Sequence, residues 1–309
     1  MIFNSKHRAS DRGVTLIEIL VVISVIALLL SLLIPAVLAA RESSRKIHCA
    51  NNLHQIGLGI ASYTNNQGAY PGPLGYFSPL VRILPYIDQT QVYDSINFNN
   101  SSRNSFTTAV TITIQLFICP SDSKPPVPGR GMTNYAVNGG TGGLDNAPFS
   151  WSPEMPLVEL NRVTDGLSTT ALASEWLRGG EPFDRDARRS VFQTEVIYFV
   201  NPGDMDKFAN LCKNLDPNQA KINGTVKGAS WLNPDFGLSA YNHCLSISNH
   251  TCTNGTLTLQ GSWTADSGHS SGCNLLFGDA HVSFVKNTIS LNLWRGLGTM
   301  NGGEMGGPF

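Results

Sequence analysis

The sequence predicts an α+β fold in which a long amino-terminal helix packs on a largely antiparallel, β-rich domain. Residues 14–34 form a strongly apolar run whose only charge is a glutamate, and a single apolar stripe continues over residues 49–63, as in one extended helix. Most of the remaining chain consists of short apolar, Thr-rich or aromatic runs between turn residues, which is typical of short strands.

The apolar segment 14–34 is expected to cross a membrane. At about 1.5 Å per residue, a helix of this length spans roughly 31 Å, enough for the hydrocarbon core. Basic residues flank the segment on both sides, so the positive-inside rule leaves its orientation open. A secretory signal has its cleavage site after the apolar run, whereas the polar-to-apolar junction here is Gly13, before the run. Cleavage at Gly13 would leave the helix attached.

Gly13, the run Val14-Thr15-Leu16-Ile17-Glu18 and Pro35 resemble the class III signal of type IV prepilins and type II secretion pseudopilins. The resemblance implies a pilin-like fold and a prepilin peptidase that cuts after Gly13 and methylates the new amino terminus at Val14. Glu18 and Pro35 then match the glutamate and the helix-bending proline of mature pilins. The sequence departs from the family at Val14, where Phe is more usual.

Glu18 and Pro35 are candidate assembly residues. A carboxylate in hydrocarbon is costly, and the ammonium group of a neighbouring subunit's amino terminus would offset much of that cost. The alternative is that Glu18 reaches water from a monomeric anchor. A membrane helix also tolerates proline without an assembly role.

Beyond the membrane, the helix is expected to continue as an amphipathic extension. Its apolar residues recur every three or four positions, and we expect them to be buried against the rest of the protein: Cys49, Leu53, Ile56, Ile60 and Tyr63. The expected organisation is a leader peptide (1–13), a transmembrane and assembly helix (14–40), the amphipathic extension (41–66), a β-rich exported domain (67–290) and a mobile carboxyl-terminal tail (291–309).

Within the exported domain, four segments are candidate strands and one is more helical. The candidate strands cover residues 107–119, 170–176, 191–200 and 273–285. The helical segment covers residues 78–96 and is broken near Pro85.

The body also resembles a bacterial family of prepilin-type proteins that carry the domain of unknown function 1559. The segments that carry this resemblance are residues 49–63, 70–73, 80–98, 118–122, 163–175 and 269–284. His269 and Asp279 follow the family's carboxyl-terminal pattern of His, nine residues, then Asp-Gly, but Ala280 replaces the glycine. The resemblance implies architecture and location more than chemistry.

The chain has six cysteines, which we expect to form disulfides because the body is exported: Cys49, Cys119, Cys212, Cys244, Cys252 and Cys273. A Cys49–Cys119 bond would staple the helix to the domain. Cys244 with Cys252 would close a local loop and leave Cys212 with Cys273, but the sequence does not fix the connectivity.

No metal, cofactor or catalytic site is predicted. Weaker alternatives are a transition-metal site and a hydrolase-like triad of Ser267, His269 and Asp279, besides calcium held by loop carboxylates and carbonyls, for which no EF-hand spacing is present and no ligands are assigned. The first would draw on His243, Cys244, His250, Cys252, His269, Asp279 and His281, whose spacing matches no standard zinc pattern. The second lacks the G-x-S-x-G elbow, so Ser267 and Asp279 are better interpreted as turn residues.

Two classes of function compete. In the first, the protein is a structural subunit of a type II secretion or type IV pilus-like fibre, with prepilin peptidase, membrane lipid and other pilin-like subunits as partners. In the second, it is a membrane-anchored binding module for a carbohydrate, a solute or a protein, with Trp151, Trp176, Trp231 and Trp263 as possible sugar contacts. A net charge of -1 argues against nucleic acid. The expected location is the inner membrane, with the body in the periplasm, on the cell surface or in an extracellular fibre.

Overall fold

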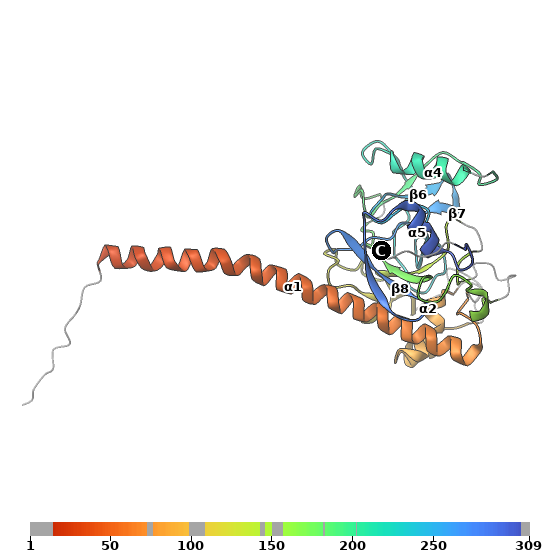
Figure 1. The fold of residues 1–309 in the computed structure, drawn as a ribbon, viewed down its shortest axis with the longest axis horizontal. Coiled ribbons are helices and arrows are strands. Elements are labelled where there is room, and N and C mark those ends of the chain that lie inside the picture. Colours follow the sequence, from red (N-terminus) through yellow and green to blue (C-terminus); the bar gives the residue numbers. More distant parts are fainter. Residues whose placement is uncertain are drawn as a thin grey trace, which may run out of the picture. The chain divides into compact units, whose positions relative to one another are not determined.

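The protein divides into two compact units, Met1–Ser44 and Arg45–Phe309. The computed structural model describes residues 15–72, 77–98, 109–142, 146–149, 157–181, 183–201 and 203–303. A long apolar helix, mixed β-sheets and several shorter helices make up the fold (Figure 1), so the expected α+β, pilin-like arrangement is confirmed.

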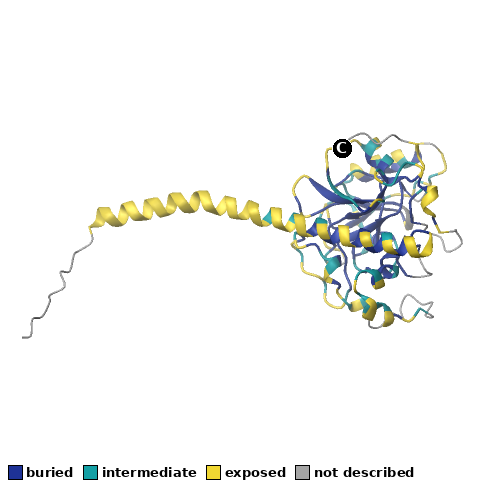
Figure 2. Ribbon diagram, turned by 60° about the horizontal axis from the view of Figure 1, so that its bottom comes forward, coloured by how far each residue is buried: buried dark blue, intermediate teal, exposed yellow. Residues whose placement is uncertain are grey.

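Helix α1 (Leu16–Gln67) runs through both units. Its residues from Leu16 to Arg41 are all exposed (Figure 2), and they include large aliphatic residues such as Leu20, Leu28 and Leu32. By its length and composition, α1 is long and apolar enough to cross a membrane.

The later turns of α1 carry the buried stripe that the sequence predicts. Cys49, Leu53 and Ile56 are fully buried, and Ile60 and Tyr63 are nearly so. These residues belong to the largest core cluster of the second unit. The amphipathic extension is therefore part of the body's core, and the boundary between the two units lies at residues 44 and 45.

The larger sheet has five strands in the order β5-β1-β2-β8-β9. Its strands are β1 (Tyr135–Asn138), β2 (Ala171–Glu175), β5 (Ala240–Tyr241), β8 (Gly272–Phe277) and β9 (Val282–Lys286). All the neighbouring pairs are antiparallel except β1 and β5.

Both faces of this sheet are covered. Tyr135, Val137 and Leu276 point into the core that the later turns of α1 complete. Ala136 and Leu275 point to the other side, into a second core that helix α5 (Leu291–Gly298) closes with the buried Trp294 and Leu297. Helix, sheet and helix thus form three layers.

The smaller sheet has the order β4-β3-β6-β7. Its strands are β3 (Val191–Gln193), β4 (Lys221–Ile222), β6 (Thr251–Asn254) and β7 (Leu257–Ser262). Helix α4 (Asp204–Lys213) packs on it through Phe208, Ala209 and Cys212, in a third core cluster with Phe192 of β3.

Several predicted elements are confirmed. The candidate strand segment 273–285 forms the two strands of the hairpin β8–β9, and β2 (Ala171–Glu175) lies within the predicted strand 170–176. The helical segment 78–96 contains α2 (Pro79–Arg82), a 3-10 turn with Pro85 at its start, and α3 (Thr90–Asp94).

The predicted strand over 107–119 was wrong for the part that the structure describes. Residues 109–119 contain two 3-10 turns, Ala109–Thr111 and Gln115–Phe117. Side chains take the place of a neighbouring strand as hydrogen-bond partners for backbone groups of this segment. The Trp231 indole donates to the carbonyl of Ile112, and Asn134 Oδ1 accepts from the backbone N–H of Cys119. The strand predicted over 191–200 is limited to β3.

The prediction of a mobile tail from residue 291 was also wrong for residues 291–303. Ser290 caps α5 by accepting from the backbone N–H of Leu293, and Trp294 is fully buried. Asp165 accepts hydrogen bonds from the backbone N–H groups of Gly302 and Gly303, which holds the chain after the helix. The buried Trp294 of the helix and the Asp165 carboxylate therefore hold this segment in place.

Candidate functional site

The first turn of α1 forms a capping box around Glu18. The Glu18 carboxylate accepts from both the backbone N–H and the hydroxyl of Thr15, each at 2.8 Å. In return, Thr15 Oγ1 accepts from the backbone N–H of Glu18 at 3.4 Å. A Thr followed three residues later by a Glu is the sequence signature of such a cap, so this contact was predictable but was missed. Glu18 therefore has a local structural role in addition to the expected role in assembly.

Pro35 lies inside α1, which continues through it. Because proline has no backbone N–H, the carbonyl of Ser31 lacks its usual helical partner. The Ser31 hydroxyl donates to the carbonyl of Leu28 at 2.7 Å, one turn earlier. Gly13 and Val14, the expected processing residues, lie outside the described residues.

The structure contains two disulfides among the described residues. Cys49 of α1 is bonded to Cys119, so the expected staple between helix and domain is confirmed. Cys212 of α4 is bonded to Cys252 of β6. The expected pairs Cys244–Cys252 and Cys212–Cys273 were wrong, because the unpredicted helix α4 places Cys212 over β6, whereas Cys273 faces the core under α5.

The two remaining cysteines are buried thiols. Burial raises the pKa of Cys244 to about 12, and burial likewise raises the pKa of Cys273 far above its ordinary value. A raised pKa keeps both thiols protonated at neutral pH and makes them poor nucleophiles.

The Cys49–Cys119 bond lies beside two ionisable side chains, Glu175 of β2 and His269 of the segment before β8. One ligand atom from each of these four residues lies within 4.8 Å of the other three, and all four residues are buried. His269 Nε2 is 4.0 Å from Cys119 Sγ and 3.6 Å from the Glu175 carboxylate. We call Cys49, Cys119, Glu175 and His269 the four-residue cluster.

Hydrogen bonds from every side hold the four-residue cluster in place. Asn274 donates to the Glu175 carboxylate with its backbone N–H at 2.8 Å and with its side-chain amide at 2.9 Å. Tyr135 Oη donates to the carbonyl of Cys49, and burial together with the Glu175 charge raises the pKa of Tyr135 well above its ordinary value. Asn52, one turn after Cys49, donates to the carbonyl of Ile118.

The structure separates the two residues of the carboxyl-terminal motif. His269 belongs to the four-residue cluster, whereas Asp279 lies in the turn between β8 and β9 and pairs with His281 at 2.5 Å. The tight turn persists without the usual glycine, because Ala280 takes a left-handed conformation with φ of 68°.

The alternative metal site and the alternative triad do not assemble. Both ring nitrogens of His243 are engaged, one with Tyr241 Oη and the other with the carbonyl of Trp294. Cys252 is in a disulfide. The Ser267 hydroxyl donates to the carbonyl of Gly272 and accepts from His269 N, so it faces the turn that it stabilises.

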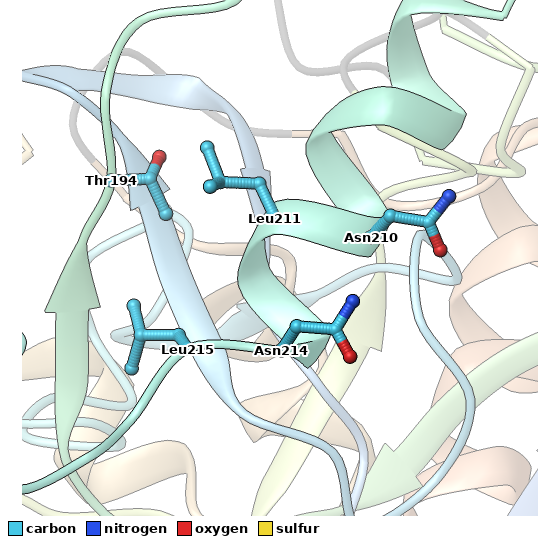
Figure 3. Close-up of a pocket in the computed structure, with 5 residues that line it drawn as sticks. All are labelled: Thr194, Asn210, Leu211, Asn214 and Leu215. Carbon is cyan, nitrogen blue, oxygen red and sulfur yellow. The ribbon is translucent and has the colours of Figure 1, made fainter.

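The body also has an open surface pocket of about 400 Å³ beside α4, lined by Thr194, Asn210, Leu211, Asn214 and Leu215. Figure 3 shows Leu211 and Leu215 on the side of Thr194, whereas the amides of Asn210 and Asn214 point the other way. In a specific ligand site, polar groups converge on the ligand, whereas the polar groups of this pocket point apart. Trp176, Trp231 and Trp263 are buried, so they cannot line a sugar site, and Trp151 lies outside the described residues.

Comparisons with known protein families agree with the arrangement of helix and body. A prokaryotic N-terminal methylation motif matches residues 8–34. This motif marks a pilin-like subunit that prepilin peptidase processes, and with the apolar helix it indicates a membrane-anchored, secretion-associated location. No curated protein and no solved structure matches the chain. A family model described as "Protein of unknown function (DUF1559)" matches residues 38–292, and since this is well over half of the sequence, the chain belongs to that family.

Proposed function

We propose that the protein is a structural subunit of a type II secretion or type IV pilus-like fibre, processed after Gly13, methylated at Val14 and assembled through α1. The supporting observation is the run of exposed apolar turns from Leu16 to Leu38, which has a single carboxylate in its first turn. A helix that is apolar on all sides requires lipid or other helices around it. Neighbouring copies of α1 would supply those contacts after extraction from the membrane.

Glu18 would set the register between subunits. A carboxylate within a membrane helix is costly, with an upper limit of about 3 kcal/mol at the helix centre on insertion scales, and the hydrogen bonds from Thr15 neutralise no charge. The ammonium of a neighbouring Val14 would supply the missing positive charge. The cytoplasmic membrane would hold the subunit before assembly, with its body in the periplasm or at the cell surface. No enzymatic activity, cofactor or nucleic-acid partner is part of this proposal.

The capping box allows the charge of Glu18 to be tested apart from its role in the helix. In Glu18→Gln, the side chain still completes the cap, because glutamine serves at this position, but the charge is gone. In Thr15→Ala, the cap hydroxyl is lost and the charge remains. The measurement is mass spectrometry of the mature amino terminus, combined with the amount of protein in a sheared filament fraction.

We expect both variants to be cut after Gly13. Thr15→Ala should enter filaments, whereas Glu18→Gln should be reduced there by more than roughly tenfold, as the loss of a buried charge pair implies. Glu18→Gln in filaments at the wild-type amount would contradict the charge pairing. If the processed wild type remains monomeric in the membrane, the fibre proposal itself fails, and the protein is a membrane anchor for its body.

A further inference from the structure

The four-residue cluster contains more chemistry than its disulfide requires. Cys49, Cys119, Glu175 and His269 are between 0% and 5% exposed, although Glu175 and His269 are not covalently involved in the bond. Burying a carboxylate is expensive unless a cation or several donors accompany it. Two hydrogen bonds from Asn274 and the nearby His269 accompany the Glu175 carboxylate, and both Glu175 and His269 present ligand atoms to the sulfur pair.

These four side chains have the composition of a closed zinc site. Structural Zn²⁺ takes four ligands from cysteine sulfur, histidine nitrogen and carboxylate oxygen in a tetrahedron. Two thiolates and one carboxylate bring the same formal charge as the three thiolates of a Cys₃His site. The four ligand atoms already lie within 4.8 Å of one another, and Zn–ligand bonds of about 2.0–2.3 Å would draw them together.

Outer contacts of the kind found around metal ligands are also present. Asn274 donates to both oxygens of Glu175, at 2.8 and 2.9 Å, and thereby fixes the orientation of the carboxylate. The backbone N–H of His269 donates to Ser267 Oγ at 3.0 Å, which orients the segment that carries the imidazole. Such second contacts hold metal ligands in position and typically change metal affinity by about 10–100-fold when removed.

We propose that the reduced protein binds one Zn²⁺ at the four-residue cluster, so that the same pair of sulfurs joins α1 to the body either through a disulfide or through the metal. A dithiol reductant breaks the S–S bond, each sulfur gains one electron and one proton, and the reductant becomes a disulfide. Zn²⁺ then binds the two sulfurs and releases their two protons. This proposal goes beyond the proposed fibre role and does not depend on it.

The test uses the full chain in detergent, unfolded with a dithiol and refolded without oxygen in the presence of Zn²⁺ alone or Co²⁺ alone. Metal content is measured by elemental mass spectrometry, and tetrahedral thiolate coordination is measured by the intense visible absorption bands of Co²⁺. We expect one metal per chain in the reduced wild type and none in the oxidised wild type. The double variant Cys49→Ser with Cys119→Ser should lose the bands.

Matched controls separate coordination from folding. The double variant Cys212→Ser with Cys252→Ser removes the second disulfide, which has no comparable group of ligands around it in the described part of the chain, and should keep the Co²⁺ bands. Glu175→Gln and His269→Gln retain the Cys49–Cys119 bond, so their fold is checked in the oxidised state by near-ultraviolet circular dichroism. Once reduced, each should bind the metal at least roughly tenfold more weakly than the wild type.

Three results would overturn the proposal. The first is that the reduced wild type binds no metal, whether it refolds or stays unfolded in the presence of Zn²⁺. The second is equal metal binding by the wild type and the Cys49/Cys119 double variant. The third is unchanged affinity in both Glu175→Gln and His269→Gln.

Discussion

His243 is a buried imidazole whose environment fits only its neutral form. Its ring stacks on Trp294 with centroids 4.0 Å apart, and its two nitrogens contact Tyr241 Oη at 2.9 Å and the carbonyl of Trp294 at 2.6 Å. Burial lowers the pKa of His243 from 6.5 to about 3. A charge at this position would have to be accommodated inside the core between the larger sheet and α5.

This lowered pKa predicts acid sensitivity. The unfolded chain binds a proton at His243 below pH 6.5, whereas the folded chain does so only near pH 3. The contribution of the neutral His243 to the free energy of unfolding is therefore complete above pH 6.5 and is lost as the pH falls toward 3. At about 1.4 kcal/mol per pH unit, the loss over this window is on the order of 5 kcal/mol. In His243→Gln, chemical denaturation at several pH values should show a lower stability at pH 7 and a shallower decline below pH 6.5.

His281→Gln is the matched control for this experiment, because His281 is partly exposed and lies in a turn. It should keep the steep decline of the wild type. A decline in His243→Gln that runs parallel to that of the wild type would show that other groups cause the acid sensitivity.

The hairpin β8–β9 shows how an element tolerates an unfavourable residue. Five residue pairs in register, from Gly272↔Lys286 to Leu276↔Val282, hold its two strands together. The backbone N–H of Phe277 donates to the carbonyl of His281 at 3.0 Å and closes the turn. Ala280 therefore keeps its left-handed conformation because the ladder on either side determines it.

Replacing Ala280 with glycine should stabilise the protein. The left-handed conformation costs an alanine about 1–2 kcal/mol, and glycine avoids this cost. The loss of the alanine methyl group from its packing cancels part of the gain in stability. We expect Ala280→Gly to raise the free energy of unfolding by about 0.5–1 kcal/mol, measured by thermal or chemical denaturation. The control Ala136→Gly, in the regular strand β1, should destabilise the protein, and a loss of stability in Ala280→Gly would contradict the proposed turn strain.

Sequence reasoning succeeded where one physical pattern dominated. The stripe from Cys49 to Tyr63 predicted the buried face of α1, because one side of the helix lies on the core. The hairpin at 273–285 was recognisable from its turn residues. Strand β1 was missed because both of its faces are buried, so it lacks the alternation of polar and apolar residues.

The four-residue cluster could not be derived from spacing. Cys49 and Cys119 are 70 residues apart, and His269 comes another 150 residues later, so only the packing of α1, β2 and the segment before β8 brings them together. The Thr15–Glu18 cap, in contrast, is a local motif and was available in the sequence. Cys212 was assigned to the wrong partner because α4 itself was not predicted.

At the scale of the whole molecule, the structure divides α1 between two environments. Leu16 to Leu38, in the first unit, are exposed and almost all apolar, whereas Arg45–Phe309 form a compact body. Residues 45–67 of the helix belong to that body, because their buried stripe completes its largest core cluster. The body should therefore fold without the membrane segment but not without this part of the helix.

Two shortened chains test this division. A chain that begins at Arg45 should show one cooperative unfolding transition and retain the Cys49–Cys119 bond. A chain that begins at Gly68 loses Leu53, Ile56 and Ile60 from the core, at about 1.5–3 kcal/mol each, and also the disulfide, which together approach the whole stability of a domain. It should show no such transition by circular dichroism. Equal transitions in both chains would contradict the role of the stripe.

The Cys49–Cys119 bond also has a mechanical consequence. When the protein is pulled between the start of α1 and the end of the body, tension reaches residue 119 directly from residue 49 and bypasses the chain between them. With 70 residues of separation and about 3.4 Å per extended residue, roughly 240 Å of chain is shielded from stretching. A subunit that is held by its helix and pulled through its body would therefore lengthen less than its full chain length allows. The shielded loop includes the buried core residues Leu80, Val81 and Leu84.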